Sequence, residues 1–280
     1  MSTTLPDIAD IVRRALAEDI GTGDITTLVT VPPDAEAQAT LVAKADGVIA
    51  GLPVAMQVFS QVDPALIVVA NVVEGETVTA GKPLMTIKGA AQSILTAERT
   101  ALNFVQRLSG IATKTARLVT LAAGTKARIV DTRKTTPGLR VLERYAVRTG
   151  GGYNHRFGLY DAVLIKDNHI QAGGGITATV QAAFAQAPHT MTVTVECDTL
   201  EQVEEAVAAG ADIILLDNMS TAQLELAVEM VAGQAALEAS GGVTEETVAA
   251  IARTGVDIIS VGALTHSAPA LDISLELKRL

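Results

Sequence analysis

The second half of the chain repeats one unit, a short apolar run followed by a segment with helical spacing. Strands that are apolar throughout and alternate with helices predict a parallel sheet that is covered on both faces. The later runs begin about 20 to 23 residues apart, a spacing typical of a (β/α) barrel, although six runs are fewer than the eight strands of a regular one. The runs occupy residues 127–132, 161–167, 192–198, 212–218, 235–242 and 257–263.

The helical segments between the later runs have recognisable ends. Thr199 with Gln202, and Ser220 with Gln223, have the spacing of a capping box, in which each side chain bonds the other residue's backbone N–H. Gly210 follows the first of these segments and predicts its C-terminus. These signals support helices between strands.

The first half of the chain has a different pattern. Residues 5–20 predict an amphipathic helix, and residues 38–88 contain three stretches with the character of β-strands. Residues 91–122 predict a long helix or a pair of helices, with a break at Ser109 and Gly110. The last β-stretch also resembles half of a biotinyl or lipoyl carrier motif. No lysine stands at the expected hairpin tip, so ordinary sheet is the favoured interpretation.

Composition argues against several classes of partner. The chain has no Trp, only seven Phe and Tyr, and a formal net charge of −10, which argues against nucleic-acid binding. A single cysteine, Cys197, suits a reducing compartment. The N-terminus has no apolar run of a signal peptide, and no apolar run is long enough to span a membrane. We therefore expect a cytoplasmic protein without a membrane or nucleic-acid partner.

One part of this acidic chain is basic. Residues 132–166 contain seven Lys or Arg against two acidic residues, and they include the sequence TRKTTPGLR (132–140). A local reversal of charge of this size predicts a binding site for anions.

The predicted strands all end on polar residues or glycine. In a parallel barrel these ends meet at one rim, where active sites are built. Arginine pairs with carboxylates through two bonds and lysine suits phosphates, so the basic residues at this rim predict an acidic ligand. Two carboxylates and two glycine-containing loops accompany them and suit a phosphorylated sugar. The rim residues are Arg133, Lys134, His155, Arg156, Lys166, Glu196, Asp217, Ser240, Gly241, Gly242, Val261, Gly262 and Ala263.

Several motifs together resemble the quinolinate phosphoribosyltransferase family. They are EDIGTGDITT (18–27), AERTALNF (97–104), DTRKTTPGLR (131–140), GGGYNHRFGLYDAVLIKDNH (150–169), ECD (196–198), LLDN (215–218) and ASGG (239–242). The resemblance implies an incomplete, seven-stranded parallel α/β barrel over residues 113–265. It also implies an N-terminal α/β sandwich over residues 1–112, completed by residues 266–280. The implied reaction joins quinolinate and phosphoribosyl pyrophosphate to give nicotinate mononucleotide, pyrophosphate and CO₂ in NAD biosynthesis. Tyr153 stands where many relatives have His.

The resemblance also implies roles for individual residues. Arg133, Arg156 and Lys166 would hold the dicarboxylate, and Arg99 would reach it from the partner subunit of a homodimer. Thr132, Lys134 and His155 would also bind the ligands, the last two on the pyrophosphate side. Glu196 and Asp217 would bind the ribose hydroxyls directly or through Mg²⁺, which is held mainly by the pyrophosphate. Lys134, Glu196 and Asp217 are the residues expected to assist catalysis.

Other interpretations stay open from the sequence. A Schiff-base lyase would use Lys166 as its nucleophile, because this lysine ends an apolar strand. A non-enzymatic anion sensor would need the arginines but not Glu196 and Asp217. A molybdenum-transport-associated homologue is the nearest alternative among related proteins, and the intact KDNH and NHR sequences favour the quinolinate enzyme.

Overall fold

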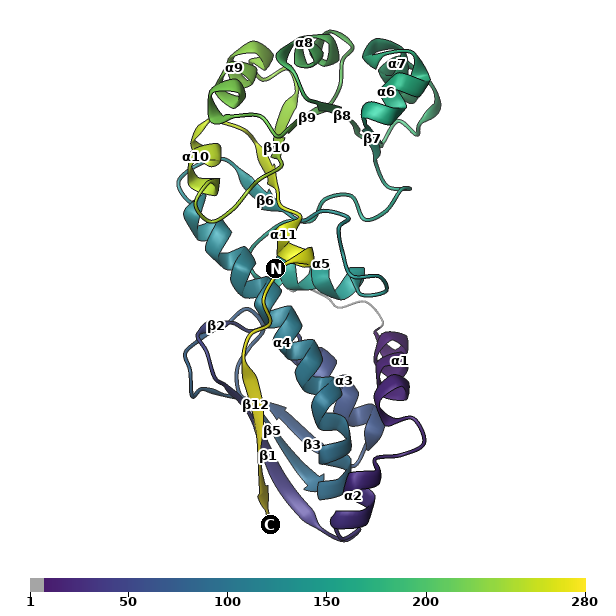
Figure 1. Ribbon diagram of the computed structural model, residues 1–280, viewed down its shortest axis with the longest axis vertical. Helices are drawn as coiled ribbons and strands as arrows, with labels where there is room; N and C mark the ends of the chain where they lie inside the picture. The colour runs from purple at the N-terminus through teal and green to yellow at the C-terminus, as the bar shows by residue number, and fades with distance from the viewer. Residues whose placement is uncertain (1–7) are drawn as a thin grey trace. The chain divides into compact units, whose positions relative to one another are not determined.

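The computed structural model describes residues 8–280 and divides into two compact units (Figure 1). Unit 1 contains the chain up to Ala116 together with Thr135–Gly151 and Ser267–Leu280. Unit 2 contains Arg117–Lys134 and Gly152–His266. Residues 135–151, which the sequence analysis assigned to the second domain, thus belong to unit 1 by their contacts. The start of the helix expected over residues 5–20 lies outside the described residues.

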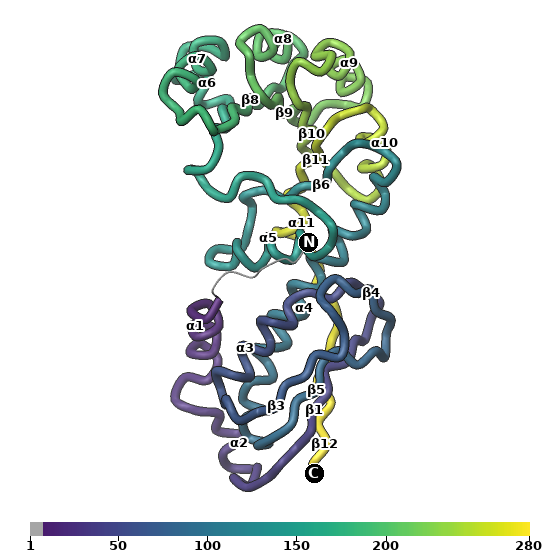
Figure 2. Tube along the Cα trace, turned by 180° about the vertical axis from the view of Figure 1, so that it is seen from behind, coloured from purple at the N-terminus to yellow at the C-terminus, as the bar shows by residue number. Residues whose placement is uncertain are grey.

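Unit 1 is built on a four-stranded antiparallel sheet with the strand order β12-β1-β5-β3. Helices α3 and α4 lie along one face of this sheet, as two opposite views show (Figures 1 and 2). The side chains of Leu41, Met85 and Ile87 are fully buried in the core of the unit. Its elements are α1 (Ala9–Ile20), α2 (Ile25–Thr30), β1 (Glu36–Ala43), β2 (Gly47–Val48), α3 (Leu52–Val62), β3 (Ile67–Ala70), β4 (Thr77–Val78), β5 (Pro83–Ala90), α4 (Ala91–Leu121, which ends in unit 2), α5 (Arg140–Thr149) and β12 (Ile273–Arg279).

The break expected at Ser109 and Gly110 is wrong, because α4 runs unbroken through 31 residues. Gly110 is required by packing: a Cβ here would overlap the carbonyl oxygen of Pro269. Ser109 is also used in packing, since its hydroxyl bonds the backbone N–H and carbonyl of Ala50. A glycine that admits a neighbouring backbone has the same sequence signature as a glycine that ends a helix.

Unit 2 is a six-stranded parallel sheet with the strand order β6-β11-β10-β9-β8-β7. The strands follow an arc, and helices α7 to α10 lie on its convex side (Figures 1 and 2). Tyr153 adds one isolated parallel bridge to Val130 at the β6 edge. The elements are β6 (Arg128–Val130), β7 (Val163–Ile165), α6 (Asp167–Gly173), α7 (Ile176–Gln186), β8 (Val193–Cys197), α8 (Leu200–Ala208), β9 (Ile213–Asp217), α9 (Thr221–Val231), β10 (Ala236–Ser240), α10 (Val248–Arg253), β11 (Ile258–Ser260) and α11 (Ala263–His266).

The local signals read from the sequence explain these elements. Both expected capping boxes are present, with Thr199 and Ser220 as the N-caps of α8 and α9. Each of the six apolar runs contains one strand of the parallel sheet. Alternation along the strands places every second side chain on the concave face, and the intervening ones, such as Ile214 and Leu216, are fully buried. No helix within residues 8–280 is both long and apolar enough to cross a membrane.

Candidate active site

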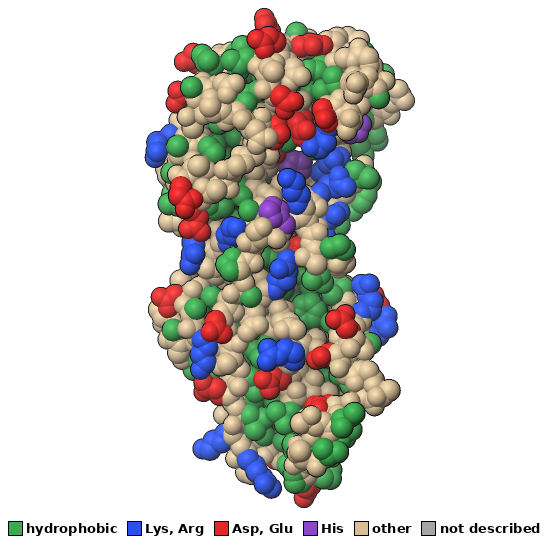
Figure 3. Space-filling model, viewed as in Figure 1, with side chains coloured by type: hydrophobic (Ala, Val, Ile, Leu, Met, Phe, Trp, Pro, Cys, Tyr) green, Lys and Arg blue, Asp and Glu red, His purple; other side chains and the backbone are tan. Residues whose placement is uncertain are grey.

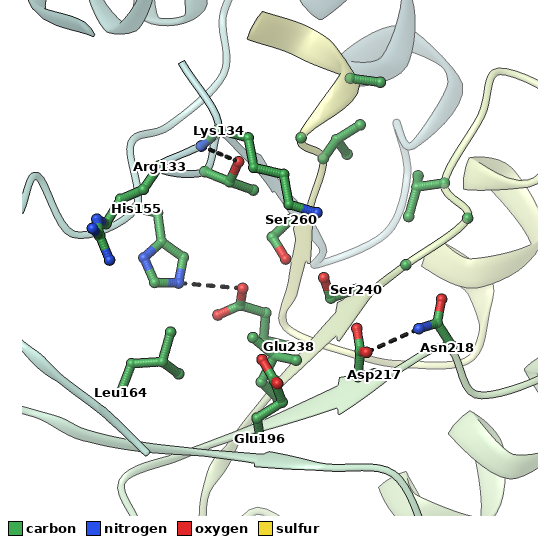
Figure 4. A pocket seen from close by; sticks show the side chains of 18 of the residues that line it. Arg133, Lys134, His155, Leu164, Glu196, Asp217, Asn218, Glu238, Ser240 and Ser260 are labelled. Atoms are coloured by element: carbon green, nitrogen blue, oxygen red, sulfur yellow. Dashed lines mark hydrogen bonds and ion pairs between the residues drawn. The ribbon is translucent and has the colours of Figure 1, made fainter. Parts of the chain in front are cut away.

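A cavity of about 590 Å³ lies at the carboxyl ends of the parallel strands, within unit 2 (Figure 4). It is lined by all the site residues predicted from the sequence except Arg99, which is an exposed residue of α4 in unit 1. The predicted residues at the cavity are Thr132, Arg133, Lys134, His155, Arg156, Lys166, Glu196, Asp217, Ser240, Gly241, Gly242, Val261, Gly262 and Ala263. Residues far apart in the sequence therefore meet here because parallel strands end at one edge.

Cations and carboxylates occupy the same cavity. In the part of Figure 3 that unit 2 occupies, Lys and Arg side chains gather beside histidines, with acidic side chains close by. Burial and then the positive charge of Arg133 lower the pKa of Arg156, whereas Asp161 acts in the opposite direction. The Arg156 guanidinium also donates to the carbonyl oxygen of Ala162 at 3.1 Å. Two guanidinium groups close enough to repel each other form a place where an anion is stabilised.

Lys166 and Glu196 form an ion pair between the ends of β7 and β8. The Glu196 side chain is largely buried, with 16% of its surface exposed, and that of Lys166 is half-exposed. His169 holds the backbone at this point, since its Nδ1 accepts from the N–H of Lys166 at 3.0 Å. The same contact caps the N-terminus of α6. His169 thus has a structural role at this turn.

Asp217, at the end of β9, is fixed by its neighbour Asn218. The Asn218 side-chain amide donates to Asp217 Oδ2 at 2.9 Å, and its backbone N–H donates to the carbonyl of Ser240 at 2.9 Å. Asn218 has a φ of 54°, a left-handed conformation that non-glycine residues adopt at a cost. Its side chain also lies where a Cβ of Gly241 would stand. Asn218 therefore connects the Asp217 carboxylate on β9 to the glycine-containing loop after β10.

The two glycine-containing loops, residues 240–242 and 261–263, line the cavity. Gly262 lies close to Lys134, because a Cβ on it would stand 3.0 Å from Lys134 Cδ. The backbone of Lys134 is held in turn by Thr265, whose hydroxyl donates to the Lys134 carbonyl at 2.7 Å. His266, at the end of α11, lines the same wall.

Asp131 was not among the predicted site residues, yet it holds the loop that carries two of them. Its carboxylate is fully buried and accepts from the N–H of His155 at 2.8 Å and from the amide of Asn154 at 2.5 Å. The same loop is anchored through the N–H of Asp131, which donates to the carbonyl of Tyr153 at 3.2 Å. The signal in the sequence was a carboxylate at the end of an apolar run, which is also the ordinary place for a solvated residue.

Glu238 lines the cavity and was also absent from the predicted site residues. It stands in the middle of β10 between apolar neighbours, with 2% of its surface exposed. Its Oε1 lies 3.3 Å from Nε2 of His155, and the close-up shows the two side chains directed at each other (Figure 4). A charged residue inside the apolar run ALEAS was the available signal, because carboxylates are rarely buried without a function or a partner.

The residues described contain no group of three or more His, Cys, Asp or Glu side chains that could hold a metal ion. Glu196 and Asp217 are the carboxylates in the predicted set that line the cavity, and carboxylate oxygens suit Mg²⁺.

Comparison with known proteins finds matches along nearly the whole chain. The model of the quinolinate phosphoribosyl transferase C-terminal domain matches residues 111–276, and that of the N-terminal domain matches residues 24–109. A probable nicotinate-nucleotide pyrophosphorylase [carboxylating] from Synechocystis is 49% identical over 95% of this chain and 91% of its own length. The nicotinate-nucleotide pyrophosphorylase [carboxylating] of Mycobacterium leprae is 47% identical, covering 96% of each chain. The crystal structure of NadC from Streptococcus pyogenes superposes with a TM-score of 0.94 at 43% identity, covering 98% of this chain and 97% of that one.

Proposed function

The chain belongs to the quinolinate phosphoribosyltransferase family, and on that premise we propose that it transfers the phosphoribosyl group of phosphoribosyl pyrophosphate to quinolinate. The carboxylate next to the ring nitrogen leaves as CO₂, and the other products are nicotinate mononucleotide and pyrophosphate. This reaction is a step of NAD biosynthesis. The observation that carries the proposal is the cavity of unit 2, where cations, strand-end carboxylates and glycine-containing loops line one space.

Arg133, Arg156 and Lys166 are assigned to the two adjacent carboxylates of quinolinate. The lowered pKa of Arg156, caused by burial and by the charge of Arg133, indicates that these guanidinium groups repel each other. A dianion relieves that repulsion, and the arginine fork suits a carboxylate through two bonds. Lys166 pairs with Glu196, so a ligand carboxylate at Lys166 competes with Glu196 for the ammonium group.

Glu196 and Asp217 are assigned to the ribose of the second substrate. Both carboxylates line the cavity from the ends of neighbouring strands. They accept hydrogen bonds from the ribose hydroxyls and stabilise the positive charge that develops on the sugar as pyrophosphate leaves. The bond from Asn218 keeps the Asp217 carboxylate in one orientation, which limits the reorganisation needed during the reaction.

The phosphate groups are assigned to the glycine-containing loops and their basic neighbour. Residues 240–242 and 261–263 line the cavity, and their loops suit a phosphate because glycine allows the ligand to approach the backbone closely. Lys134 and His155 bind on the pyrophosphate side, and Thr132 also binds the ligands. Lys134 stabilises the departing pyrophosphate by its charge.

The loss of CO₂ requires orientation and charge from the protein. Once the ring nitrogen is bonded to the sugar, its positive charge stabilises the carbanion left behind by the carboxylate. No side chain has to act as a nucleophile, so the residues of the cavity bind, orient and exclude water.

Mg²⁺ is proposed as the cofactor. The carboxylates of Glu196 and Asp217 fit a hard cation that takes its remaining ligands from the substrate and water, since Mg²⁺ sites in enzymes usually combine one or two carboxylates with substrate phosphates. When bound, Mg²⁺ neutralises charge on the pyrophosphate leaving group. We expect excess EDTA to abolish turnover and added Mg²⁺ to restore it. Full activity in EDTA would contradict this role.

Assembly and location complete the proposal. We propose a homodimer in which Arg99 of one subunit contributes a cation to the cavity of the other, because Arg99 is exposed on α4 and belongs to a matching motif. We also propose that the arc of strands corresponds to an incomplete barrel whose seventh member lies near Tyr153, next to β6. The single thiol, Cys197, is consistent with a reducing compartment such as the cytoplasm.

A Schiff-base lyase that uses Lys166 is the competing enzyme class. The ion pair with Glu196 disfavours it, because a lysine held as a charged ammonium is not nucleophilic. Borohydride reduction in the presence of the aldehyde or ketone substrate that such a lyase requires distinguishes the two classes. A stable adduct at Lys166 is expected for the lyase, and none is expected for phosphoribosyl transfer.

The test of the proposed function is the release of labelled CO₂ from carboxyl-labelled quinolinate, with and without phosphoribosyl pyrophosphate. Release is expected only with both substrates, together with equal amounts of nicotinate mononucleotide and pyrophosphate. Nicotinate serves as the matched acceptor, since it lacks one carboxylate and would leave a cation of the cavity unpaired. Turnover of nicotinate at a comparable rate would contradict the assignment of the basic residues to a dicarboxylate.

A further inference from the structure

Glu238 is a buried carboxylate in a cavity that otherwise suits anions. It lies at the middle of β10, where its register partners are Leu215 of β9 and Ile258 of β11. Its side chain is 3% exposed and lines the cavity from the concave face of the sheet (Figure 4). A carboxylate at such a position is costly unless a donor satisfies it. Its partner therefore indicates what it does.

The partner is His155, and two contacts assign the protonation of its ring. The backbone N–H of Arg156 donates to Nδ1 of His155 at 2.7 Å, so Nδ1 is an acceptor and carries no proton. The ring proton is then on Nε2, which lies 3.3 Å from Glu238 Oε1, a close polar contact outside hydrogen-bond geometry. The imidazole is held between a donor on one side and a carboxylate on the other.

The contact at Nδ1 links the imidazole to the course of the backbone. His155 and Arg156 are consecutive. The hydrogen bond from the Arg156 N–H to His155 Nδ1 therefore fixes the backbone turn from which the Arg156 side chain extends. The Asp131 carboxylate also holds this turn, because it accepts from the N–H of His155 at 2.8 Å. A proton on Nδ1 would place two donors against each other and open this turn.

We propose that Glu238 is a positioning residue that acts through His155. It keeps the imidazole in the tautomer with the proton on Nε2, which leaves Nδ1 open to the N–H of Arg156. The guanidinium of Arg156 is thereby held ready for a ligand carboxylate. The last step rests on the proposed function, in which Arg156 binds quinolinate, whereas the state of the His155 ring does not.

Two substitutions separate the polar contact from the negative charge. Glu238→Gln keeps an oxygen facing the Nε2 proton and removes the negative charge. Glu238→Met removes both and keeps the unbranched shape, and Glu238→Leu replaces it if the methionine chain does not fold. Loss of a polar contact of about 1.4 kcal/mol corresponds to about a tenfold change. We expect Glu238→Met to raise the KM for quinolinate about tenfold with a smaller change in the KM for phosphoribosyl pyrophosphate, and Glu238→Gln to stay within about threefold of wild type.

A double-variant cycle tests whether Glu238 acts through His155. In a His155→Ala background the mediating ring is gone, so Glu238→Met is expected to add little to the effect of His155→Ala. Asp257→Asn is the matched control, because Asp257 is also a carboxylate beside β10 and accepts from the N–H of Leu237 at 2.9 Å. Asp257 is not among the residues that line the cavity, so its substitution is expected to affect the melting temperature and not the KM for quinolinate.

Nitrogen-15 NMR of the histidine rings provides the readout that is independent of activity. His155 is one of four histidines in the chain and can be assigned with His155→Ala. Wild type and Glu238→Gln should show an unprotonated Nδ1 and a protonated Nε2, whereas Glu238→Met should show a mixture of tautomers. Should the wild-type chain release no CO₂ from quinolinate, the proposed function fails and the NMR result still decides the role of Glu238.

Three results would overturn the proposal. The first is an unchanged His155 ring and quinolinate KM in Glu238→Met. The second is equal loss in Glu238→Gln and Glu238→Met with the ring unchanged, which would assign the effect to charge. The third is full additivity of Glu238→Met and His155→Ala, which would mean that Glu238 acts independently of the imidazole.

Discussion

Gly241 and Gly242 are adjacent in the loop after β10, and they differ in what a side chain would meet. Gly241 has a φ of 89°, and a Cβ on it would overlap Oδ1 and Cγ of Asn218. Gly242 has a φ of 60°, and nothing lies within 4 Å of the position of its Cβ. Replacing each by alanine therefore compares backbone strain alone with strain plus a steric clash.

The expected magnitudes follow from these two terms. A left-handed conformation costs a residue with a Cβ about 1–2 kcal/mol, and this is the whole cost at Gly242. Overpacking against Asn218 adds about 1–3 kcal/mol at Gly241. A change of 1 kcal/mol shifts the melting temperature by about 2–4 °C in a chain of this size. We expect Gly242→Ala to melt about 4 °C below wild type and Gly241→Ala about 10 °C below.

The clash at Gly241 is also expected to change kinetics. The backbone of Asn218 is tied to the carbonyl of Ser240, so relief comes by moving the Asn218 side chain away from Asp217. Each 1.4 kcal/mol lost in the transition state lowers kcat/KM about tenfold. We expect Gly241→Ala to lower kcat and raise the KM for phosphoribosyl pyrophosphate about tenfold more than Gly242→Ala does.

Circular dichroism is the suitable probe of melting, because the chain has no Trp. Initial rates at varied phosphoribosyl pyrophosphate give the kinetic terms. Asn218→Gly removes the clashing side chain, so the Gly241→Ala/Asn218→Gly double variant should regain part of the lost melting temperature relative to Gly241→Ala. Equal losses in Gly241→Ala and Gly242→Ala, or no recovery in the double variant, would refute the steric coupling between the two strand ends.

Three further predictions follow from the cavity and the core. Arg133→Ala should raise the KM for quinolinate and lower kcat with little change in melting temperature; normal kinetics with a large loss of stability would make Arg133 structural. Arg99→Ala and Lys166→Ala chains, inactive alone, should regain up to roughly a quarter of wild-type activity when subunits exchange, because half of a random two-fold mixture is heterodimer and each heterodimer has one complete site. Burial raises the pKa of Cys197 to about 12. Below pH 9 the thiol is protonated in both the folded and the unfolded state. As the pH rises from 9 toward 12 the thiol ionises more readily in the unfolded state, so the stability of the folded state falls. A thiol reagent at pH 8 should therefore react with Cys197 only after unfolding; rapid reaction of the folded protein would contradict its burial.

Local signals predicted the strands and helices of unit 2 because the two kinds of element differ in hydrophobic periodicity and in the residues that begin and end them. The capping boxes at Thr199 and Ser220 depend on residues three positions apart, and such short-range chemistry is visible in a sequence. Helix α3 (Leu52–Val62) was not expected, because its residues are mainly apolar and follow stretches with β character. In such a segment periodicity does not separate a buried helix from a strand.

Long-range packing explains what the sequence could not predict at Gly110 and Glu238. An unbroken helix at Gly110 could be predicted only with the knowledge that the Pro269 backbone packs directly against this glycine of α4. A role for Glu238 could be predicted only with the knowledge that its side chain on β10 faces His155, which lies in a loop 83 positions earlier in the chain. The charges at the strand ends were predictable because a parallel sheet places all of them at one edge, whatever their separation along the chain.

The side chains that face the cavity are held by polar contacts with residues next to them. Asp131 fixes the loop of His155 and Arg156, and Asn218 fixes Asp217. Loops carry binding residues but lose their geometry easily, since few apolar contacts hold them. A buried carboxylate or a left-handed asparagine costs stability by itself, and it persists where the surrounding bonds hold it in one arrangement. The cost is consistent with a site that must hold several cations close together before an anion arrives, because flexible loops would let these cations move apart.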